Sequence, residues 1–151
     1  MQNQKKAELT KRLIAALIDG IISSIIAVIP VIGAIIGAAY TLTKDGIMFQ
    51  VTKDAQWKNR SIGKKLLGLE VVTASGAEID IVASCMRNWP LAIGIIIMIV
   101  PIIGWVIGGL LAFVLGMIEL VLVLIDPKGR RLGDKTARTM VVESATAQDA
   151  A

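Results

Sequence analysis

Two long stretches of the chain carry almost no charge, and they constrain the fold more than any other feature. Asp19 is the only charged residue between positions 13 and 43, and Glu119 is the only one between positions 88 and 125. About 20 apolar residues suffice to span a bilayer. A straight helix over either stretch, at ~1.5 Å per residue, would far exceed a hydrocarbon core of ~30 Å. We therefore expect each stretch to fold back on itself within a membrane.

The turning points are marked by a proline followed three residues later by a glycine, Pro30 with Gly33 and Pro101 with Gly104. Proline removes a helix donor, and glycine permits the turn. All 16 Lys and Arg residues lie outside the two stretches, which places both flanks of each hairpin in the cytoplasm by the positive-inside rule. The alternative, one kinked crossing per stretch, would leave a basic block outside.

These features predict an all-α membrane protein of four transmembrane helices arranged as two hairpins. Hydrophobic residues make up 55% of the chain, which fits a membrane protein, and the basic flanks place both termini in the cytoplasm. A cleavable N-terminal signal is the alternative for the first stretch, but Asp19 within the apolar run argues against it. We expect a single membrane domain over residues 1–143, with helices near 13–29, 31–48, 87–100 and 102–125, cytoplasmic segments at 1–12, 49–86 and 126–143, and a disordered tail at 144–151.

The two hairpins have similar sequences around their turns, at residues 29–37 and 100–108. Because both copies begin and end in the cytoplasm, they predict a parallel pseudo-repeat about an axis along the membrane normal. Convergence on a common turn is the alternative. Small residues recur on one helix face in each copy, at Gly33 and Gly37 and at Gly104 and Gly108. Such faces let helices pack closely, within the bundle or against a second copy of the chain, and a substrate groove is the other interpretation.

A second similarity follows each hairpin and predicts a small cytoplasmic β element. The segment 63–66 precedes Val71 and Val72, as the segment 129–132 precedes Val141 and Val142 with four more residues between. β-branched runs closed by turn residues are typical of strands, so we expect these two segments to pair. Residues 79–87 predict a short interfacial helix leading into the third crossing.

The composition excludes most familiar catalysis. There is no histidine and a single cysteine, Cys85, which leaves no intrachain disulfide, no Cys/His zinc site and no imidazole base. No phosphate-binding glycine motif occurs, and the basic residues lack interleaved aromatics, so neither a nucleotide nor a nucleic acid is expected as a ligand. We predict a protein that is not an enzyme and has no cofactor or metal, whose cytoplasmic basic segments contact anionic lipid headgroups.

Three segments carry a recognisable pattern of charged and glycine residues. They are residues 11–19 with Arg12 and Asp19, residues 61–72 with Gly63 and Lys64, and residues 126–142 with Asp126 and Asp134. In this order they resemble the RDD family of small bacterial membrane proteins, named for one arginine and two aspartates. The resemblance implies that Arg12 is the family arginine, Asp19 the first aspartate, and either Asp134 or Asp45 the second. It also implies a location in the bacterial inner (plasma) membrane and a transport-related function, with sodium(lithium)/proton exchange proposed for some members. The alternative is a non-transporting accessory, assembly or lipid-interacting membrane protein.

The charges within the apolar stretches suggest a site. Arg12 and Asp19 lie two helical turns apart on one face, and Glu119 and Asp126 repeat that spacing in the fourth helix. An ionised carboxylate within a membrane helix is costly and must face protein or water. A shared cation or proton site formed by Asp19, Glu119 and Arg12 is one interpretation. The alternatives are that Arg12, Arg87 or a helix end neutralises Asp19 and only fixes the bundle, or that these charges contact lipid or another protein.

Overall fold

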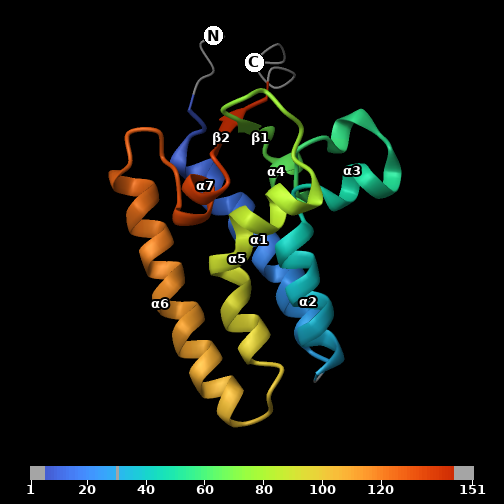
Figure 1. The fold of residues 1–151 in the computed structure, drawn as a ribbon, viewed down its shortest axis with the longest axis vertical. Helices are drawn as coiled ribbons and strands as arrows, with labels where there is room; N and C mark the ends of the chain where they lie inside the picture. Colours follow the sequence, from blue (N-terminus) through green and yellow to red (C-terminus); the bar gives the residue numbers. More distant parts are fainter. Residues whose placement is uncertain (1–5, 30, 145–151) are drawn as a thin grey trace.

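The computed structural model describes residues 6–29 and 31–144, and it consists of two long helical hairpins beneath a charged layer. The first hairpin contains α1 (Leu9–Ala27) and α2 (Ile32–Thr43), and the second contains α5 (Ile81–Ile97) and α6 (Ile103–Ile125) (Figure 1). Along the chain, the first hairpin is followed by α3 (Ile47–Thr52), the short helix η1 (Ala55–Trp57), α4 (Ile62–Leu66) and β1 (Leu69–Thr73). The second hairpin is followed by α7 (Leu132–Thr136) and β2 (Thr139–Glu143).

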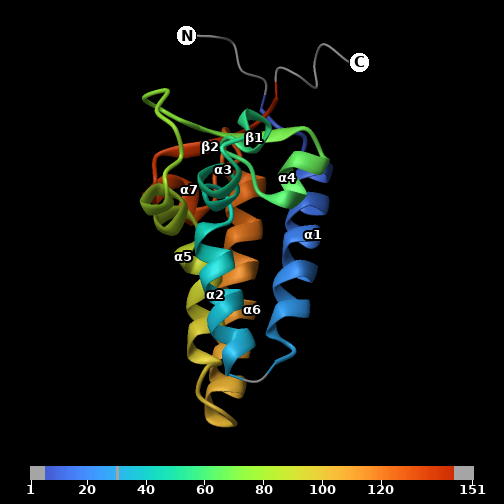
Figure 2. The same ribbon diagram turned by 90° about the vertical axis from the view of Figure 1, so that its right-hand side faces the viewer.

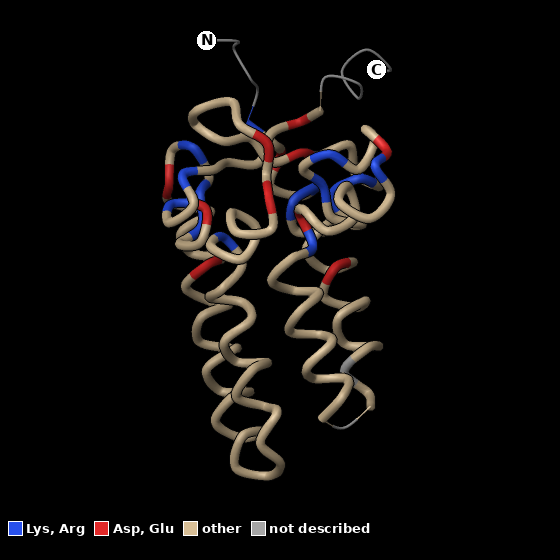
Figure 3. The backbone as a smooth tube through the Cα atoms, turned by 45° about the vertical axis from the view of Figure 1, so that its right-hand side comes forward, with Lys and Arg blue, Asp and Glu red and all other residues tan. Residues whose placement is uncertain are grey.

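Charged residues gather at one end of the molecule. Figure 3 shows Lys, Arg, Asp and Glu concentrated around the strands and short helices, while most of the length of the four long helices carries none. We call residues 44–80 and 126–144 the charged layer. Of the described residues, only α6 forms a helix both long and apolar enough to cross a membrane, and α2 and α5 are shorter apolar helices. Val106, Leu110 and Phe113 on α6 are 71%, 65% and 66% exposed, which suits an apolar surrounding.

Two predicted helix boundaries were wrong. The second helix was expected to run to residue 48, but α2 ends at Thr43 and α3 begins at Ile47. The break directs Lys44 and Asp45 into the charged layer, where both are buried. The third helix was expected to begin at residue 87 after a separate interfacial helix at 79–87, but α5 is continuous from Ile81. It begins there because the side chain of Asp80 accepts a hydrogen bond from the Ala83 amide at 2.7 Å.

The hairpin turns share a strained backbone. Val31 and Ile102, which directly precede α2 and α6, have φ values of 62° and 65°, a region that β-branched residues rarely adopt. The Ile103 amide donates to the Pro101 carbonyl at 2.8 Å, which closes a tight three-residue turn over Ile102. Pro30, predicted to mark the first turn, lies outside the described residues. The two turns therefore repeat each other in conformation as well as in sequence.

The long helices pack as an open row in the order α1, α2, α5, α6. Neighbours in the row contact each other extensively, whereas α1 and α6, at its two ends, have little contact. Figure 2 shows α1 standing apart from α6. The predicted small-residue faces are buried among the helices. Gly33 and Gly37 are buried on α2, and a Cβ at Gly104 or Gly108 would overlap backbone atoms of α5.

The predicted pairing of the two strands is confirmed. β1 and β2 form an antiparallel ribbon centred on the pair Val71 and Val141. A residue of β1 and the residue of β2 that lies 70 positions later in the chain occupy equivalent places, one on each strand. The ribbon therefore has the symmetry of a two-fold axis through this pair. The helices before the strands obey the same relation, since α4 packs on α1 and α7 packs on α5.

The predicted alignment of the second similarity was wrong. Gly63 corresponds to Gly133 rather than to Gly129, and no four-residue insertion is needed. A Cβ at Gly63 would overlap the Ala15 carbonyl, and a Cβ at Gly133 would overlap the Arg87 carbonyl. The equivalent glycines thus allow each short helix to contact the backbone of its own hairpin. The sequence misled because Gly129 is also followed by two basic residues and a leucine.

Candidate functional site

A cavity of about 500 Å³ lies inside the row of helices, on the side where α1 and α6 leave it open. Its wall deeper among the helices is mainly apolar and includes Leu91, Ile95 and Met98. Its end at the charged layer is lined by six charged side chains: Arg12, Asp19, Lys44, Lys64, Glu119 and Arg131. The cavity therefore has one apolar end and one ionic end.

Asp19 fixes α4 to α1. Its carboxylate accepts hydrogen bonds from Ser61 Oγ at 2.6 Å and from the Gly63 amide at 2.9 Å, both at the N-terminal end of α4. An anionic group is favoured there because the first amides of a helix have no partner within the helix. The Nζ atoms of Lys44 and Lys64 lie 3.6 and 3.9 Å from Asp19 Oδ2. Asp19 is thus buried, with 1% exposure, and the two lysines balance its negative charge.

Glu119 has the same role in the second half of the molecule. Its carboxylate accepts hydrogen bonds from the Leu132 amide at 2.9 Å and the Gly133 amide at 3.3 Å, in the first turn of α7. Glu119 comes from α6, however, whereas Asp19 comes from α1. Both predicted acids line the one cavity, and each holds the start of a short helix in the charged layer.

Lys44 differs from the other cations of the site. It is 6% exposed, its closest ionic partner is Asp19 at 3.6 Å, and its ammonium group makes no hydrogen bond to any residue that the structure describes within 6–29 and 31–144. Burial lowers its pKa to about 8, with Asp19 and Asp45 opposing the shift and Lys64 and Arg131 adding to it. Its ammonium group therefore faces the cavity with donors to spare.

Behind the cavity, a buried ion network ties the two hairpins together. Arg87 on α5 lies 3.3 Å from Asp45 and 2.8 Å from Asp134, in ion pairs without hydrogen-bond alignment. Lys64 Nζ donates to Asp45 at 2.7 Å, and Arg12 reaches Asp134 at 3.4 Å. These cations outweigh the loss of solvent around the acids and hold the pKa of Asp45 and of Asp134 below the usual range.

The predicted site residues are thus only partly brought together. Arg12 was expected beside Asp19 but pairs with Asp134 and with the Gly129 carbonyl. Asp126, whose spacing from Glu119 repeats that between Arg12 and Asp19, binds Arg130 and Lys135 outside the cavity. The two candidates for the second family aspartate, Asp45 and Asp134, meet on Arg87.

Sequence reasoning missed Lys44 and Arg131 as cavity residues. Each was counted only as part of a basic flank, because positive-inside arguments treat such residues as solvent-exposed. A signal did exist for Lys44, since it is the first charged residue after Asp19 and lies where the helix ends. Only the tertiary fold shows that it turns inward.

Between the ionic end and the apolar wall, the cavity is lined by small and hydroxyl residues. Ser23 and Thr41 lie 3.2 Å apart through their hydroxyl oxygens, and Ser24 lies beside them in the lining. Gly20 and Gly116 also line the cavity, and a Cβ added to either would find no atom within 4 Å. In the described part of the chain, no group of three or more Cys, Asp or Glu side chains is arranged to hold a metal ion.

Comparison with known proteins gives one match. The RDD family model matches residues 46–138, which cover most of the charged layer and the whole second hairpin. No curated protein and no solved structure matches the chain.

Proposed function

This chain belongs to the membrane-associated RDD family, and from that premise we propose that its four long helices cross a bacterial plasma membrane as two hairpins. The charged layer and both termini would then lie in the cytoplasm. Two observations support this topology: the charges gather at one end of the molecule, and the helix surfaces away from that end are apolar and exposed. α2 and α5, with 12 and 17 residues, are short for a membrane span, so they would need the hairpin partner to shield their ends.

For its function, we propose that the protein takes a negatively charged amphiphile from the cytoplasmic leaflet into the cleft between α1 and α6, as a transport-related or lipid-interacting protein. The observation that carries this proposal is the cavity of about 500 Å³ with four cations at one end and an apolar wall at the other. Burying charge beside an unfilled space in a membrane is costly, and proteins do so at ligand sites. The open side of the row would admit a molecule that already lies in the bilayer.

The charge balance favours an anion over a bare cation. Four cations and two acids line the cavity, and both acids already accept two hydrogen bonds from the ends of α4 and α7. A sodium ion would have to compete with those donors and with Lys44. A negatively charged group would instead find an ammonium group with free donors.

The proposal is tested with two variants that place a larger side chain inside the cleft. Gly20→Leu and Gly116→Leu place side chains in space that no other atom occupies, so the fold should persist. Protein purified from membranes would be examined by native mass spectrometry for retained lipid. The wild type should carry anionic lipid, and each leucine variant should lose most of it.

Val106→Phe is the control, because it adds similar bulk on the exposed face of α6. It should retain lipid as the wild type does. Equal retention by all four proteins would refute the cleft as the binding site. So would a wild type that is a stable dimer, with leucine variants that are monomers, because the cleft would then hold a second copy of the chain.

Sodium/proton exchange is the second candidate function, and the observation in its favour is that Asp19 and Glu119 line a single cavity. In liposomes, Asp19→Asn and Glu119→Gln would each abolish exchange if the pair forms one site, and the double variant would be no worse. Exchange at the wild-type rate in Asp19→Asn would exclude this function. Loss of folded protein in Asp19→Asn would instead indicate that Asp19 serves to hold α4 on α1.

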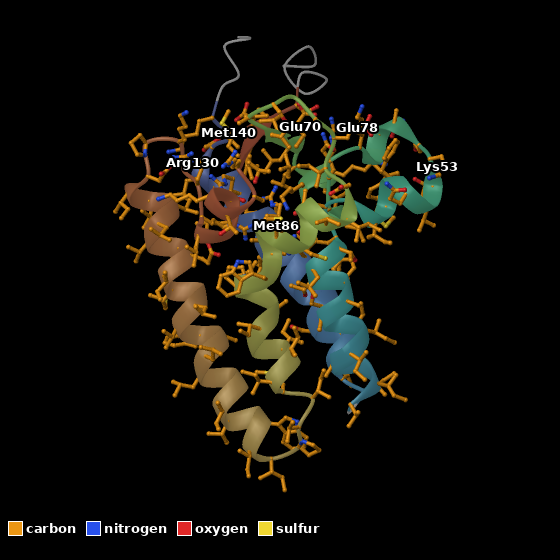
Figure 4. All side chains as sticks on the ribbon, in the orientation of Figure 1. Lys53, Glu70, Glu78, Met86, Arg130 and Met140 are labelled. Atoms are coloured by element: carbon orange, nitrogen blue, oxygen red, sulfur yellow. The ribbon has the colours of Figure 1, made fainter. Side chains whose placement is uncertain are left out.

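A further part of the proposal concerns the α3 arm, residues 47–60, which extends sideways from the bundle (Figure 1). Val51 is 73% exposed, and Lys53 at the tip of the arm points outward (Figure 4). The ammonium of Lys65 lies 3.8 Å above the ring of Trp57. An arm with these properties at the level where the helices end would rest on anionic headgroups.

A further inference from the structure

Two polar levels follow each other along the α1–α6 cleft. The upper level contains Lys44, whose side chain is nine-tenths buried and lines the cavity, and whose ammonium group makes no hydrogen bond to any described residue. The lower level contains the hydroxyl groups of Ser23, Ser24 and Thr41. Thr41 precedes Lys44 by three residues and Ser23 follows Asp19 by four, so the levels are about 5 Å apart at ~1.5 Å per residue. Beyond the hydroxyls the wall is apolar.

This order of groups matches one class of molecule. A glycerophospholipid has a phosphate, then acyl ester carbonyls a few bonds away on the glycerol, then hydrocarbon chains. The phosphate would accept hydrogen bonds from Lys44, the ester carbonyl would accept from the hydroxyls, and a chain would lie against Ile95 and Met98. A fatty acid or a free phosphate would leave the hydroxyl level without a partner.

We infer that the ligand of the cleft is an ester-linked glycerophospholipid with a single negative charge, whose phosphate binds Lys44 and whose ester carbonyl binds Thr41 and Ser23. This inference rests on the proposed function and specifies its ligand.

The single negative charge of the ligand follows from the balance of charged side chains around the cavity. Ion pairs join five cations, Arg12, Lys44, Lys64, Arg87 and Arg131, to three carboxylates, Asp19, Asp45 and Asp134. The fourth carboxylate of the cavity, Glu119, is held by backbone amides of α7. One positive charge is left over, and an unpaired buried charge is strongly unfavourable. A phosphodiester supplies one negative charge and completes the balance, whereas a phosphomonoester at neutral pH brings an excess.

The test measures which lipid the purified full-length protein retains from vesicles of phosphatidylcholine with an added probe lipid. The wild type should prefer ester-linked phosphatidylglycerol over phosphatidylcholine by about tenfold or more, as expected for a hydrogen bond to a charged group. Lys44→Met should abolish this preference. The control Lys128→Met removes an exposed lysine that lies outside both the cavity lining and the α3 arm, and it should leave the preference intact.

The ester contact is tested with an ether-linked phosphatidylglycerol, which lacks the carbonyls. The wild type should retain the ester form about two- to tenfold better, the range of a neutral hydrogen bond. Thr41→Val combined with Ser23→Ala should remove that difference. Thr43→Val is the control, since the Thr43 hydroxyl donates to the Ala39 carbonyl of its own helix at 2.7 Å and does not line the cavity.

The variants distinguish failure of the proposed function from failure of the inference. Lipid retained equally by the Gly20→Leu and Gly116→Leu variants would overturn the proposed function itself. Loss of lipid in those variants, with the phosphatidylglycerol preference kept in Lys44→Met, would overturn the inference alone. So would retention of phosphatidic acid above phosphatidylglycerol, or an equal affinity of the wild type for ester and ether forms.

Discussion

At the scale of single residues, Lys44 links the cleft to pH. Its ammonium is desolvated, and its pKa of about 8 lies below the ordinary value of 10.5. We predict that binding of phosphatidylglycerol weakens as pH rises through about 8, because the neutral amine cannot neutralise a phosphate. Binding of the lipid should also raise the pKa of Lys44, so protons should be taken up on binding near pH 8. Titration of lipid retention between pH 6 and 10 checks this, and an unchanged affinity over that range would contradict it.

The same residue affects stability with the opposite sign. Between pH 8 and 10.5 the unfolded chain holds the Lys44 proton more tightly than the folded protein does, so the contribution of this residue to folding rises with pH across that window. The charged groups that act on Lys44 in the folded protein are Asp19, Asp45, Lys64 and Arg131. Lipid affinity and the Lys44 contribution to stability therefore change in opposite directions.

Close backbone contact at a glycine gives a second prediction at this scale. Gly63→Ala would drive a methyl group into the Ala15 carbonyl, and such overpacking costs about 1–3 kcal/mol or more. Gly20→Ala meets no neighbour and should be neutral or stabilising by up to ~1 kcal/mol. Thermal unfolding in detergent compares the two. If both variants unfold at the same temperature, α4 does not contact α1 as described.

At the scale of elements, the hairpin turns hold strain that a sequence does not reveal. Ile102 has φ 65° and is 72% exposed, so Ile102→Gly should relieve backbone strain of about 1–3 kcal/mol while removing few contacts. We predict a higher unfolding temperature for this variant. Ile107→Gly, within α6, should instead lower stability by about 1 kcal/mol. A decrease in both variants would show that the turn conformation is not strained.

How far the elements could be predicted depended on what determines each of them. Charge-poor stretches and Pro/Gly pairs were enough to locate both hairpins, and β-branched runs were enough to pair Val71 with Val141. The end of α2 could not be predicted, because Lys44 and Asp45 leave the helix for tertiary partners, Asp19 and Arg87. Arg12 was paired with the wrong aspartate for a similar reason: spacing along one helix says nothing of Asp134, which is distant in sequence.

At the scale of the whole molecule, the two-hairpin topology predicts where the chain can be labelled from either side of the membrane. In a Cys85→Ser background, cysteines at Ile32 and Ile102 should react only with a reagent added outside. Cysteines at Ala55 and Ser75, in the charged layer, should react only from the cytoplasmic side. Membrane-impermeant maleimide on intact cells and on inverted vesicles makes the comparison. External labelling at Ala55 or Ser75 would exclude an even number of crossings.

The two-fold register of the ribbon has a consequence for how this protein can be made. Each half of the chain has its own hairpin, its own short helix seated on that hairpin, and one strand of a shared ribbon. The connection between the halves passes through Gly76, where φ is 76° and no atom lies within 4 Å of an added Cβ. Fragments 1–76 and 77–151, expressed as separate polypeptides, should therefore assemble into the same structure, which is that of a dimer whose two subunits have become one chain.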